Sequence, residues 1–276
     1  MNTKDGRTMQ VQGTEVPRLG FGTFELPGRP CREGVRDALE IGYRHIDTAR
    51  GYENESDVGA GIRDSGVARD AIFVTTKIPP EQAASDDVRR SAEGSLRDLG
   101  MDHVDLMLLH WPAPQVPLGE TLEAMRALQE EGKARHLGVS NFPPRLLREA
   151  LDHIEVFANQ VEFHPFLGQD ALLELAEAND FTVTAYAPLA HGKVPGDPTL
   201  REIADSLGRT PAQVALRWLL EIPRTTVIPK ASSHERRVEN FDVFDWELPD
   251  EARARVAALP KDQRDFDPPW GPDWSE

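Results

Sequence analysis

The sequence has a single cysteine, Cys31, among its 276 residues. One thiol can form neither an internal disulfide nor the multi-cysteine cage of a structural zinc site. Cys31 falls near the start of a predicted helix, where a thiol pKa can fall, but we expect a spare thiol there. Long apolar runs are also missing, since no stretch reaches the length needed to cross a bilayer. We therefore expect neither a disulfide scaffold nor a membrane protein.

Basic residues are scarce, with 31 lysines and arginines against 47 acidic residues and a net charge of −16. Such an acidic surface argues against nucleic acid and anionic membranes as partners. Residues 1–7 are polar and no apolar signal core follows them, so we expect a cytoplasmic protein. The lysines are Lys4, Lys77, Lys133, Lys193, Lys230 and Lys261. A GC-rich genome explains arginine over lysine but not the acid excess, which predicts a halophilic enzyme from a salt-rich cytoplasm.

A glycine-rich dinucleotide fingerprint is also absent, because the first predicted strand, at residues 19–22, does not continue as G-x-G-x-x-G. This disfavours a doubly wound sheet. Strand and helix patterns instead alternate at about one unit per thirty residues, and the strands are nearly continuous apolar runs. The expected strands are 19–22, 44–47, 72–77, 104–110, 136–140, 158–162, 182–186 and 226–230. The expected helices are 30–41, 56–65, 85–99, 118–131, 144–153, 170–179, 199–207, 211–221 and one from about 233.

The pattern predicts one domain, residues 1–276, with the α/β fold of a (β/α)8 TIM barrel. Two short strands at residues 9–11 and 15–17 predict an N-terminal β-hairpin ahead of the barrel. The segment from residue 261 onwards, rich in proline and tryptophan, predicts an irregular C-terminal tail that folds over the barrel mouth.

Three of the predicted strands end in Asp47, Lys77 and His110, and Tyr52 follows the first of them. The carboxyl ends of barrel strands meet at the face where active sites are built. A buried Lys77 would lower the pKa of the Tyr52 phenol, and Asp47 would keep Lys77 charged. A neutral His110 would orient a carbonyl oxygen. Such a set suits protonation of an oxygen while a hydride reaches its carbon.

Each of these residues also has an ordinary explanation when taken alone. Asp47 could cap a turn, Lys77 could extend to the surface, and His110 could be a hydrogen-bonded core histidine. The occurrence of all four at neighbouring strand ends favours a functional site.

A second candidate site follows the eighth strand, which ends at Lys230. Residues Ser232 to Glu235 fit a capping box that opens a helix. Lys230 and Arg236, with Arg237 as a weaker candidate, place cations at this helix start, where barrel enzymes often hold phosphate. Cations at a helix N-terminus oppose the macrodipole, so an anionic ligand explains them better than a solvated turn does.

With these motifs in place, the chain resembles the aldo-keto reductase superfamily, and most closely its small prokaryotic branch similar to diketogluconate reductases. The resemblance rests on motifs spread over nearly the whole chain in family order. They are Gly42–Ala49 with Tyr52; Thr75–Lys77; Leu108–Pro112; Gly138–Phe142; Asn159–Glu162; and Ile228–Lys230 with Arg236, Glu239 and Asn240.

The resemblance implies NADPH-dependent reduction of aldehydes or ketones to alcohols, with Tyr52 as general acid. The implied catalytic tetrad is Asp47, Tyr52, Lys77 and His110. The implied cofactor contacts are Thr23, Asp47, Ser140, Asn141, Gln160, Tyr186, Lys230, Ser232, Arg236, Glu239 and Asn240. Among them, Tyr186 is expected to stack on the nicotinamide, and Ser140, Asn141 and Gln160 to bind its carboxamide.

Lys230 and Arg236 are expected to bind the 2′-phosphate of NADP(H), with Glu239 and Asn240 on the adenine. Ala231 stands where relatives commonly have serine, so one phosphate hydrogen bond is missing and NADH stays open as a weaker cofactor. Phe24 and Trp111, with the tail residues Trp270 and Trp274, are expected to form an apolar substrate wall.

Two other functions stay open at this point. A cofactor-binding regulatory module of the same fold would show little turnover, and a barrel enzyme of unrelated chemistry would not bind NADPH. A metal hydrolase is disfavoured because no histidine pair has ligand spacing on one helix, so we expect no metal. We expect a monomer whose partner is a small carbonyl substrate, with short loops that tolerate many such substrates.

Overall fold

Eight parallel strands form the central sheet of the computed structural model, which describes residues 6–275. They are β3 Phe21–Gly22, β4 His45–Asp47, β5 Phe73–Ile78, β6 Val104–Leu109, β7 Ala134–Ser140, β8 Val156–Glu162, β9 Thr182–Tyr186 and β10 Thr225–Val227. Strands that follow one another in the chain are neighbours in the sheet. The edges meet where Leu19 bridges Val227 and where the Gly22 amide donates to Pro229 O. The predicted (β/α)8 fold is confirmed.

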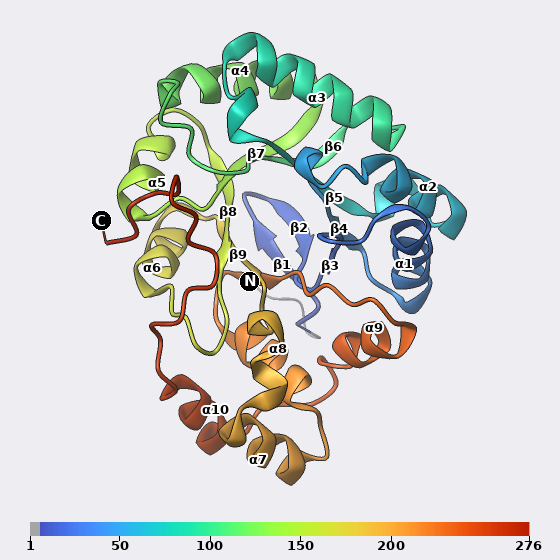
Figure 1. Cartoon of the computed structure of the whole chain (residues 1–276), viewed down its shortest axis with the longest axis vertical. Helices are drawn as coiled ribbons and strands as arrows, with labels where there is room; N and C mark the ends of the chain where they lie inside the picture. The colour runs from blue at the N-terminus through green and yellow to red at the C-terminus, as the bar shows by residue number, and fades with distance from the viewer. Residues whose placement is uncertain (1–5, 276) are drawn as a thin grey trace.

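The helices lie outside the strands (Figure 1). They are α1 Gly28–Ile41, α2 Glu55–Ser65, α3 Ser85–Leu99, α4 Leu118–Glu130, α5 Pro144–Leu151, α6 Asp170–Asn179, α7 Pro198–Leu207, α8 Pro211–Glu221, α9 His234–Phe241 and α10 Asp250–Ala257. Short 3-10 turns are η1 Arg50–Tyr52, η2 Arg69–Ala71, η3 Pro80–Gln82, η4 Ala190–Gly192 and η5 Val194–Gly196. Within residues 6–275 no helix is long and apolar enough to span a bilayer.

Two differences from the expected elements have a clear physical reason. Helix α10 was not expected, because only Ala252 and Val256 of its eight residues are buried and they give no visible apolar period. Strand β10 ends at Val227 rather than at Lys230, since Pro229 has no amide hydrogen to continue the ladder. Residues 1–5, including Lys4, lie outside the described part of the chain.

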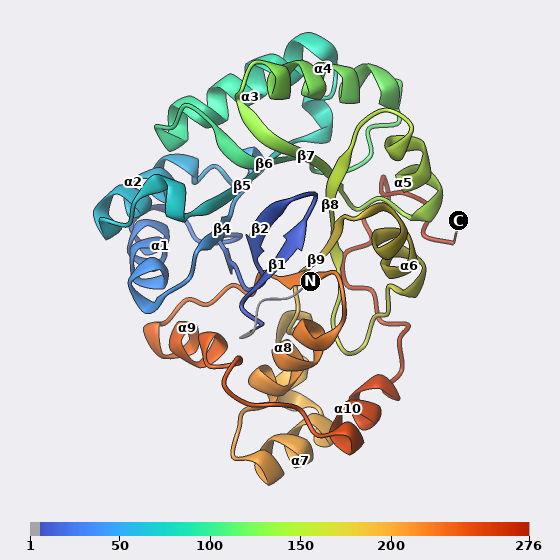
Figure 2. The same cartoon turned by 180° about the vertical axis from the view of Figure 1, so that it is seen from behind.

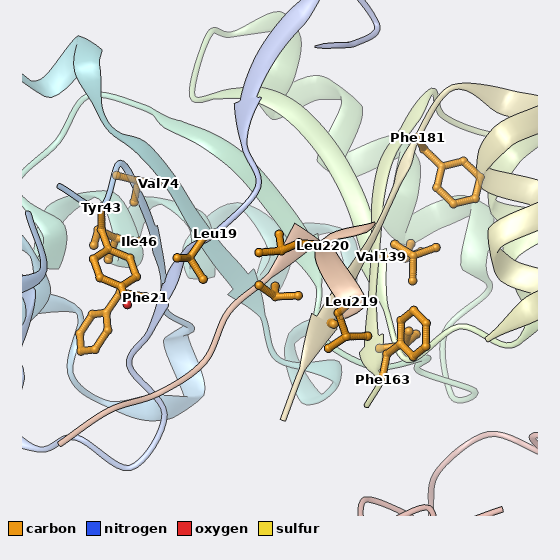
Figure 3. Close-up of a cluster of buried hydrophobic side chains, with 14 of the residues drawn as sticks. Leu19, Phe21, Tyr43, Ile46, Val74, Val139, Phe163, Phe181, Leu219 and Leu220 are labelled. Carbon is orange, nitrogen blue, oxygen red and sulfur yellow. The ribbon is translucent and has the colours of Figure 1, made fainter. Parts of the chain in front are cut away.

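The core lies between the strands and the helices around them. Strands β5, β6 and β8 are buried along their whole length, as expected of parallel strands covered on both faces. Figure 3 shows part of this cluster, with Ile46 and Val74 from strands and Leu219 from α8. Trp218, expected in the core, is 7% exposed and its ring lies 6.2 Å from that of Phe163.

The turn into β4 requires a glycine. Helix α1 ends at Ile41 and is capped by Gly42, whose φ of 129° is strained for any residue with a side chain. A Cβ atom there would also lie 2.9 Å from the ring of Phe241. Cys31, inside α1, is fully buried, and burial raises the pKa of its thiol to about 12, so it is unreactive.

The two ends of the barrel are covered differently. The hairpin expected at the N-terminus is confirmed by the antiparallel pair β1 Thr8–Val11 and β2 Thr14–Pro17. Its side chains Val11 and Val16 pack with Phe73, at the amino end of β5. Figure 2 shows the hairpin at the centre of the face where the strands begin. In Figure 1 the irregular tail after α10 crosses the opposite face. The tail therefore passes over the carboxyl ends of the strands.

Candidate active site

Four side chains meet at the carboxyl ends of the strands. Asp47 ends β4, Lys77 is the penultimate residue of β5, His110 follows β6, and Tyr52 ends η1. The Lys77 Nζ lies 2.6 Å from Asp47 Oδ1 and 3.3 Å from the Tyr52 hydroxyl. The rings of Tyr52 and His110 lie edge to face, with centroids 5.6 Å apart. The structure thus brings the four residues of the expected tetrad together at one point of the barrel mouth.

Lys77 is fully buried and charged. Its ammonium donates to three acceptors: Asp47 Oδ1, Thr48 O at 2.8 Å and the Tyr52 hydroxyl. Burial lowers the pKa of Lys77, but the charges and hydrogen bonds of Asp47 and Tyr52 more than offset burial, so this pKa lies above its ordinary value. Asp47 therefore keeps the ammonium charged, as the sequence indicated.

Lys77 lowers the pKa of Tyr52 as expected, but the net shift of this pKa has the opposite sign. Burial raises the pKa of its phenol, and this outweighs the opposite effect of the Lys77 charge, so the pKa lies above the ordinary value. The nearby Asp47 carboxylate acts in the same direction as burial. The sequence showed the cation but not the balance between burial and the Lys77 charge at the phenol. Tyr52 therefore keeps its proton at neutral pH.

His110 is a neutral imidazole. Burial, and then repulsion from Lys77, lower its pKa to about 3. Its backbone is fixed on both sides, since its amide donates to Ile78 O at 2.9 Å and its carbonyl accepts from Asn141 Nδ2 at 3.0 Å. A neutral ring in this position can donate one hydrogen bond towards the space beside the Tyr52 hydroxyl.

The loop that carries Tyr52 is held by Asn54, to which the sequence analysis gave no role. The Thr48 hydroxyl donates to Asn54 Oδ1 at 2.8 Å, and Asn54 Nδ2 donates to the carbonyls of Thr23 and Leu26 at 2.9 and 3.0 Å. Its place before α2 suggests a helix cap, but its side chain caps no amide. Asn54 instead ties the loops after β3 and β4 together.

The residues expected around the nicotinamide form one hydrogen-bonded chain. Tyr186 donates its hydroxyl to Asn141 Oδ1 at 2.8 Å, and Asn141 Nδ2 donates to Ser140 Oγ at 3.1 Å. Ser140 Oγ donates to the carbonyl of Gln160 at 2.8 Å, and Gln160 Nε2 donates to Asp47 Oδ2 at 2.7 Å. The chain therefore connects the ends of β7, β8 and β9 to the tetrad.

Two further features fix this region. Asn141 has a φ of 63°, a left-handed conformation that is uncommon outside glycine and tends to occur at functional sites. Thr23, another expected cofactor contact, is fully buried and donates its hydroxyl to Asp47 O at 3.0 Å. The backbone of Asp47 is therefore fixed by the loop after β3.

The start of α9 differs from the expected capping box. The N-cap is Ser233, whose hydroxyl accepts the amide of Arg236 at 3.3 Å, so the prediction that Ser232 pairs with Glu235 was wrong. Ser232 instead accepts a hydrogen bond from Lys230 Nζ at 3.3 Å. The helix therefore begins one residue later than the sequence pattern indicated.

The cations near α9 divide into two kinds. Arg237 is buried, pairs with Asp37 at 2.6 Å and donates to Ala231 O at 3.0 Å, so it holds the helix in place. Lys230 and Arg236 are exposed and, within residues 6–275, neither pairs with a carboxylate. In a chain with 47 acidic residues, two unpaired cations at a helix N-terminus fit an anionic ligand.

The expected adenine contacts lie further along α9. Glu239 is partly exposed and accepts the hydroxyl of Thr210 at 2.8 Å, whereas Asn240 is buried. Both are within a turn or so of Arg236 on the same helix.

Aromatic rings surround the mouth above the tetrad. Phe24 is 40% exposed, and its centroid lies 5.0 Å from that of Tyr52. Trp111 packs against two tail residues, Trp270 at 5.1 Å and Trp274 at 6.2 Å. Phe266, also in the tail, lies 6.4 Å from Phe24 and 5.3 Å from Tyr186. Phe266 was not among the predicted site residues, since its only signal in the sequence is an apolar ring in an irregular segment expected to cross the mouth.

Known proteins share both the sequence and this architecture. The model of the Aldo/keto reductase family matches residues 18–261. Glyoxal reductase of Bacillus subtilis (strain 168) is 40% identical over 255 residues, which cover 91% of this chain and 92% of the relative. A solved structure of a putative 2,5-diketo-D-gluconic acid reductase B has a TM-score of 0.95 at 39% identity and covers 98% of each chain. A Bombyx mori aldo-keto reductase in complex with NADP has a TM-score of 0.87 at 31% identity and covers 94% of each chain. This chain belongs to the aldo/keto reductase family of oxidoreductases.

Proposed function

We propose that this protein reduces aldehydes or ketones to alcohols with NADPH, and that Tyr52 is the general acid. The observation that carries the proposal is the Tyr52 hydroxyl, which lies 3.3 Å from the Nζ of the buried Lys77 at the barrel mouth. A carbonyl oxygen that accepts a hydride at its carbon must gain a proton, and Tyr52 holds one there.

Lys77 acts when the proton leaves Tyr52. The phenol is a weak acid because its pKa is raised, yet negative charge that develops on its oxygen lies beside the Lys77 ammonium. An ammonium already in place in a buried site stabilises such charge without reorganisation. Asp47 maintains the ammonium in its charged form, since burial alone lowers the pKa of Lys77.

His110 has a different part. Because its pKa lies near 3, the ring is neutral at physiological pH and does not compete with Tyr52 as an acid. A neutral ring can donate a hydrogen bond to the carbonyl oxygen and so fix that oxygen next to the phenol.

The residues present fit a nicotinamide cofactor. The amide side chains of Asn141 and Gln160 and the hydroxyl of Ser140 offer donors and acceptors of the kind a carboxamide requires. The ring of Tyr186 offers an aromatic face beside them. When bound, the cofactor supplies the hydride.

A preference for NADPH over NADH is inferred from α9. Lys230 and Arg236 lack carboxylate partners in the described chain, which suits recognition of a 2′-phosphate. Ser232 would contribute a hydroxyl, and Glu239 and Asn240 would bind the adenine. Because Ala231 offers no hydroxyl, NADH remains a weaker alternative.

The substrate class is inferred from the mouth and from the relatives. An aromatic rim of Phe24 and Trp111 suits small neutral carbonyl compounds. One relative is a glyoxal reductase and one structural neighbour is a putative 2,5-diketo-D-gluconic acid reductase. A screen of NADPH oxidation across aldehydes, α-dicarbonyls and keto-sugars would identify the preferred class. We also infer a cytoplasmic monomer that needs neither metal nor nucleic acid.

Replacement of Tyr52 by phenylalanine tests the proposal. We expect reduction to fall by at least about 10²–10⁴-fold while NADPH binds almost normally, because only the proton donor is lost. Tyr43→Phe is the matched control, since it removes a phenol that donates to Arg237 O outside the tetrad. Wild-type turnover by Tyr52→Phe, with hydride transfer rate-limiting, would exclude Tyr52 as the acid. A wild-type protein that binds NADPH but reduces no carbonyl would instead be a regulatory module.

A further inference from the structure

A buried carboxylate that has no part in the proposed chemistry ends the strand that carries Gln160. Glu162, the last residue of β8, is fully buried. Its oxygens accept the backbone amides of Asp265, at 2.8 and 3.1 Å, and Phe266, at 2.8 Å. They also lie 2.9 Å from His164 Nε2. Burial of a charge is costly unless it is paired, and three of these four contacts are made with the C-terminal tail.

The geometry of His164 shows what this cluster does. Its Nδ1 accepts the amide of Phe166 at 3.2 Å, so the ring proton is on Nε2 and is donated to Glu162. Glu162, His164 and Asp265 lie close enough to hold a metal ion, but this tautomer leaves Nε2 without a lone pair. Asp265 Oδ1, in turn, pairs with Lys193 at 2.5 Å. The cluster is therefore a hydrogen-bonded clamp and not a metal site.

The clamp is one end of a longer set of contacts between the C-terminal tail and the barrel. Residues 261–266, here named the strap, follow residues 162–167 along the barrel. Gln263 donates its amide to Phe166 O at 3.0 Å, and Lys261 Nζ donates to Pro165 O. Leu167 and Asp262 form an antiparallel bridge. The strap is irregular, so these contacts with the barrel, together with the clamp, set its path.

The strap carries Phe266 to the mouth of the site. The Phe266 ring lies 5.3 Å from Tyr186, 4.7 Å from His191 and 6.4 Å from Phe24. Phe24 in turn touches Tyr52. Because Glu162 binds the amides of Phe266 and of the residue before it, the carboxylate fixes the backbone from which this ring projects.

We propose that Glu162 is a positioning residue for substrate specificity: by fastening the strap, it holds the Phe266 ring as one wall of the carbonyl pocket. This inference rests on the proposed carbonyl reduction at Tyr52. The wall is aromatic and lies beside the acid rather than on it. It therefore favours carbonyl compounds that carry an aromatic or extended apolar group, and it contributes little to two-carbon substrates that do not reach it.

Two substitutions distinguish the effect of the Glu162 clamp from that of the Phe266 ring. Glu162→Gln removes the charge and turns an NH2 group towards the donors, whereas Phe266→Ala leaves the clamp and removes the ring. Glu174→Gln is the matched control, because it makes the same chemical change on the exposed face of α6. Amide exchange of Asp265 and Phe266, followed by mass spectrometry of the tail peptide, reports on the clamp without any need for activity.

We expect Glu162→Gln to speed exchange of these two amides by at least about ten-fold, since bonds to a buried charge are lost, and Glu174→Gln to leave it unchanged. Both Glu162→Gln and Phe266→Ala should raise KM for benzaldehyde by about ten-fold and leave kcat nearly constant. Neither should alter KM for glyoxal by more than about two-fold. If Glu162 acts through Phe266, the double variant should match Phe266→Ala.

Unchanged exchange in Glu162→Gln, or additive effects on the benzaldehyde KM, would overturn the proposal. If Glu162→Gln does not fold, Phe266→Ala still tests whether the Phe266 ring is a wall of the pocket. This variant must raise the benzaldehyde KM while amide exchange in the tail stays at the wild-type rate. Wild-type protein that reduces no carbonyl compound of the wider screen would refute the proposed function. The amide-exchange result would then test only whether Glu162 fastens the tail.

Discussion

The ion pair between Lys77 and Asp47 gives a quantitative prediction, because both side chains are almost completely buried, at 0% and 2% exposure. Asp47→Asn removes the carboxylate charge and leaves the ammonium with neutral acceptors alone: the new amide oxygen, Thr48 O and the Tyr52 hydroxyl. Lys77→Met leaves the carboxylate with Gln160 Nε2. Either change strands a buried charge, and breaking a buried pair in this way costs about 3–5 kcal/mol of unfolding free energy.

The double variant distinguishes coupling from separate effects. Asp47→Asn with Lys77→Met removes both charges, so it should cost much less than the sum of the two single changes. Each single variant should melt roughly 10 °C below the wild type, given about 2–4 °C per kcal/mol for a chain of this order of size. Thermal melts followed by circular dichroism measure all four proteins.

The pH dependence of stability tests the ion pair independently, because the wild type and Asp47→Asn should respond to pH in opposite directions. In the wild type the folded-state pKa of Lys77 is raised, so its stabilisation is complete below about pH 10.4 and is lost as pH rises through the folded value. Without Asp47, burial dominates and the folded pKa falls below the unfolded one. Stability of Asp47→Asn should then increase with pH up to about 10.4. Additive losses in the double variant, or equal pH slopes in both proteins, would refute this account of the pair.

Two further predictions concern the cofactor and salt. Lys230→Ala with Arg236→Ala should weaken NADPH by at least about 100-fold and NADH only slightly, since each charge-assisted phosphate contact contributes roughly 1.5–3 kcal/mol. Fluorescence titrations measure this, with the exposed Arg148→Ala as control, and equal weakening of both cofactors would exclude 2′-phosphate recognition. The net charge of −16 should make the melting temperature rise between low salt and about 1 M KCl, where the Debye length falls to about 3 Å and carboxylate repulsion is screened. NADPH association should persist over that range, and a melting temperature that is flat or falls with KCl would contradict the halophilic hypothesis.

The sequence predicted most of the barrel because its strands are local apolar runs with fixed spacing. Strand β9 and helices α3, α6 and α8 have the predicted limits, and most other elements differ by one to three residues. Helix α10 was missed because only Ala252 and Val256 of its residues are buried, so the sequence shows no apolar face there. The cap of α9 was misplaced by one residue, since Ser232 and Ser233 are both suitable caps in the sequence. In the structure Ser233 caps the helix, and Ser232 accepts a hydrogen bond from Lys230.

Part of the candidate site could likewise be predicted from the sequence, and part could not. Strand ends are determined by the sequence, and in a barrel they converge, so Asp47, Lys77 and His110 could be grouped without a structure. The pKa of Tyr52 could not be predicted in this way, because its sign depends on the balance between burial and the Lys77 charge.

Contacts between segments far apart in the chain were beyond the sequence. Glu162 and Phe266 are separated by 104 positions, and no local pattern indicates that a buried carboxylate binds a tail amide. Periodicity and strand ends are properties of neighbouring residues, and the sequence by itself determined them. Desolvation and long-range hydrogen bonds depend on what the folded chain places around each group, and only the tertiary structure decided them.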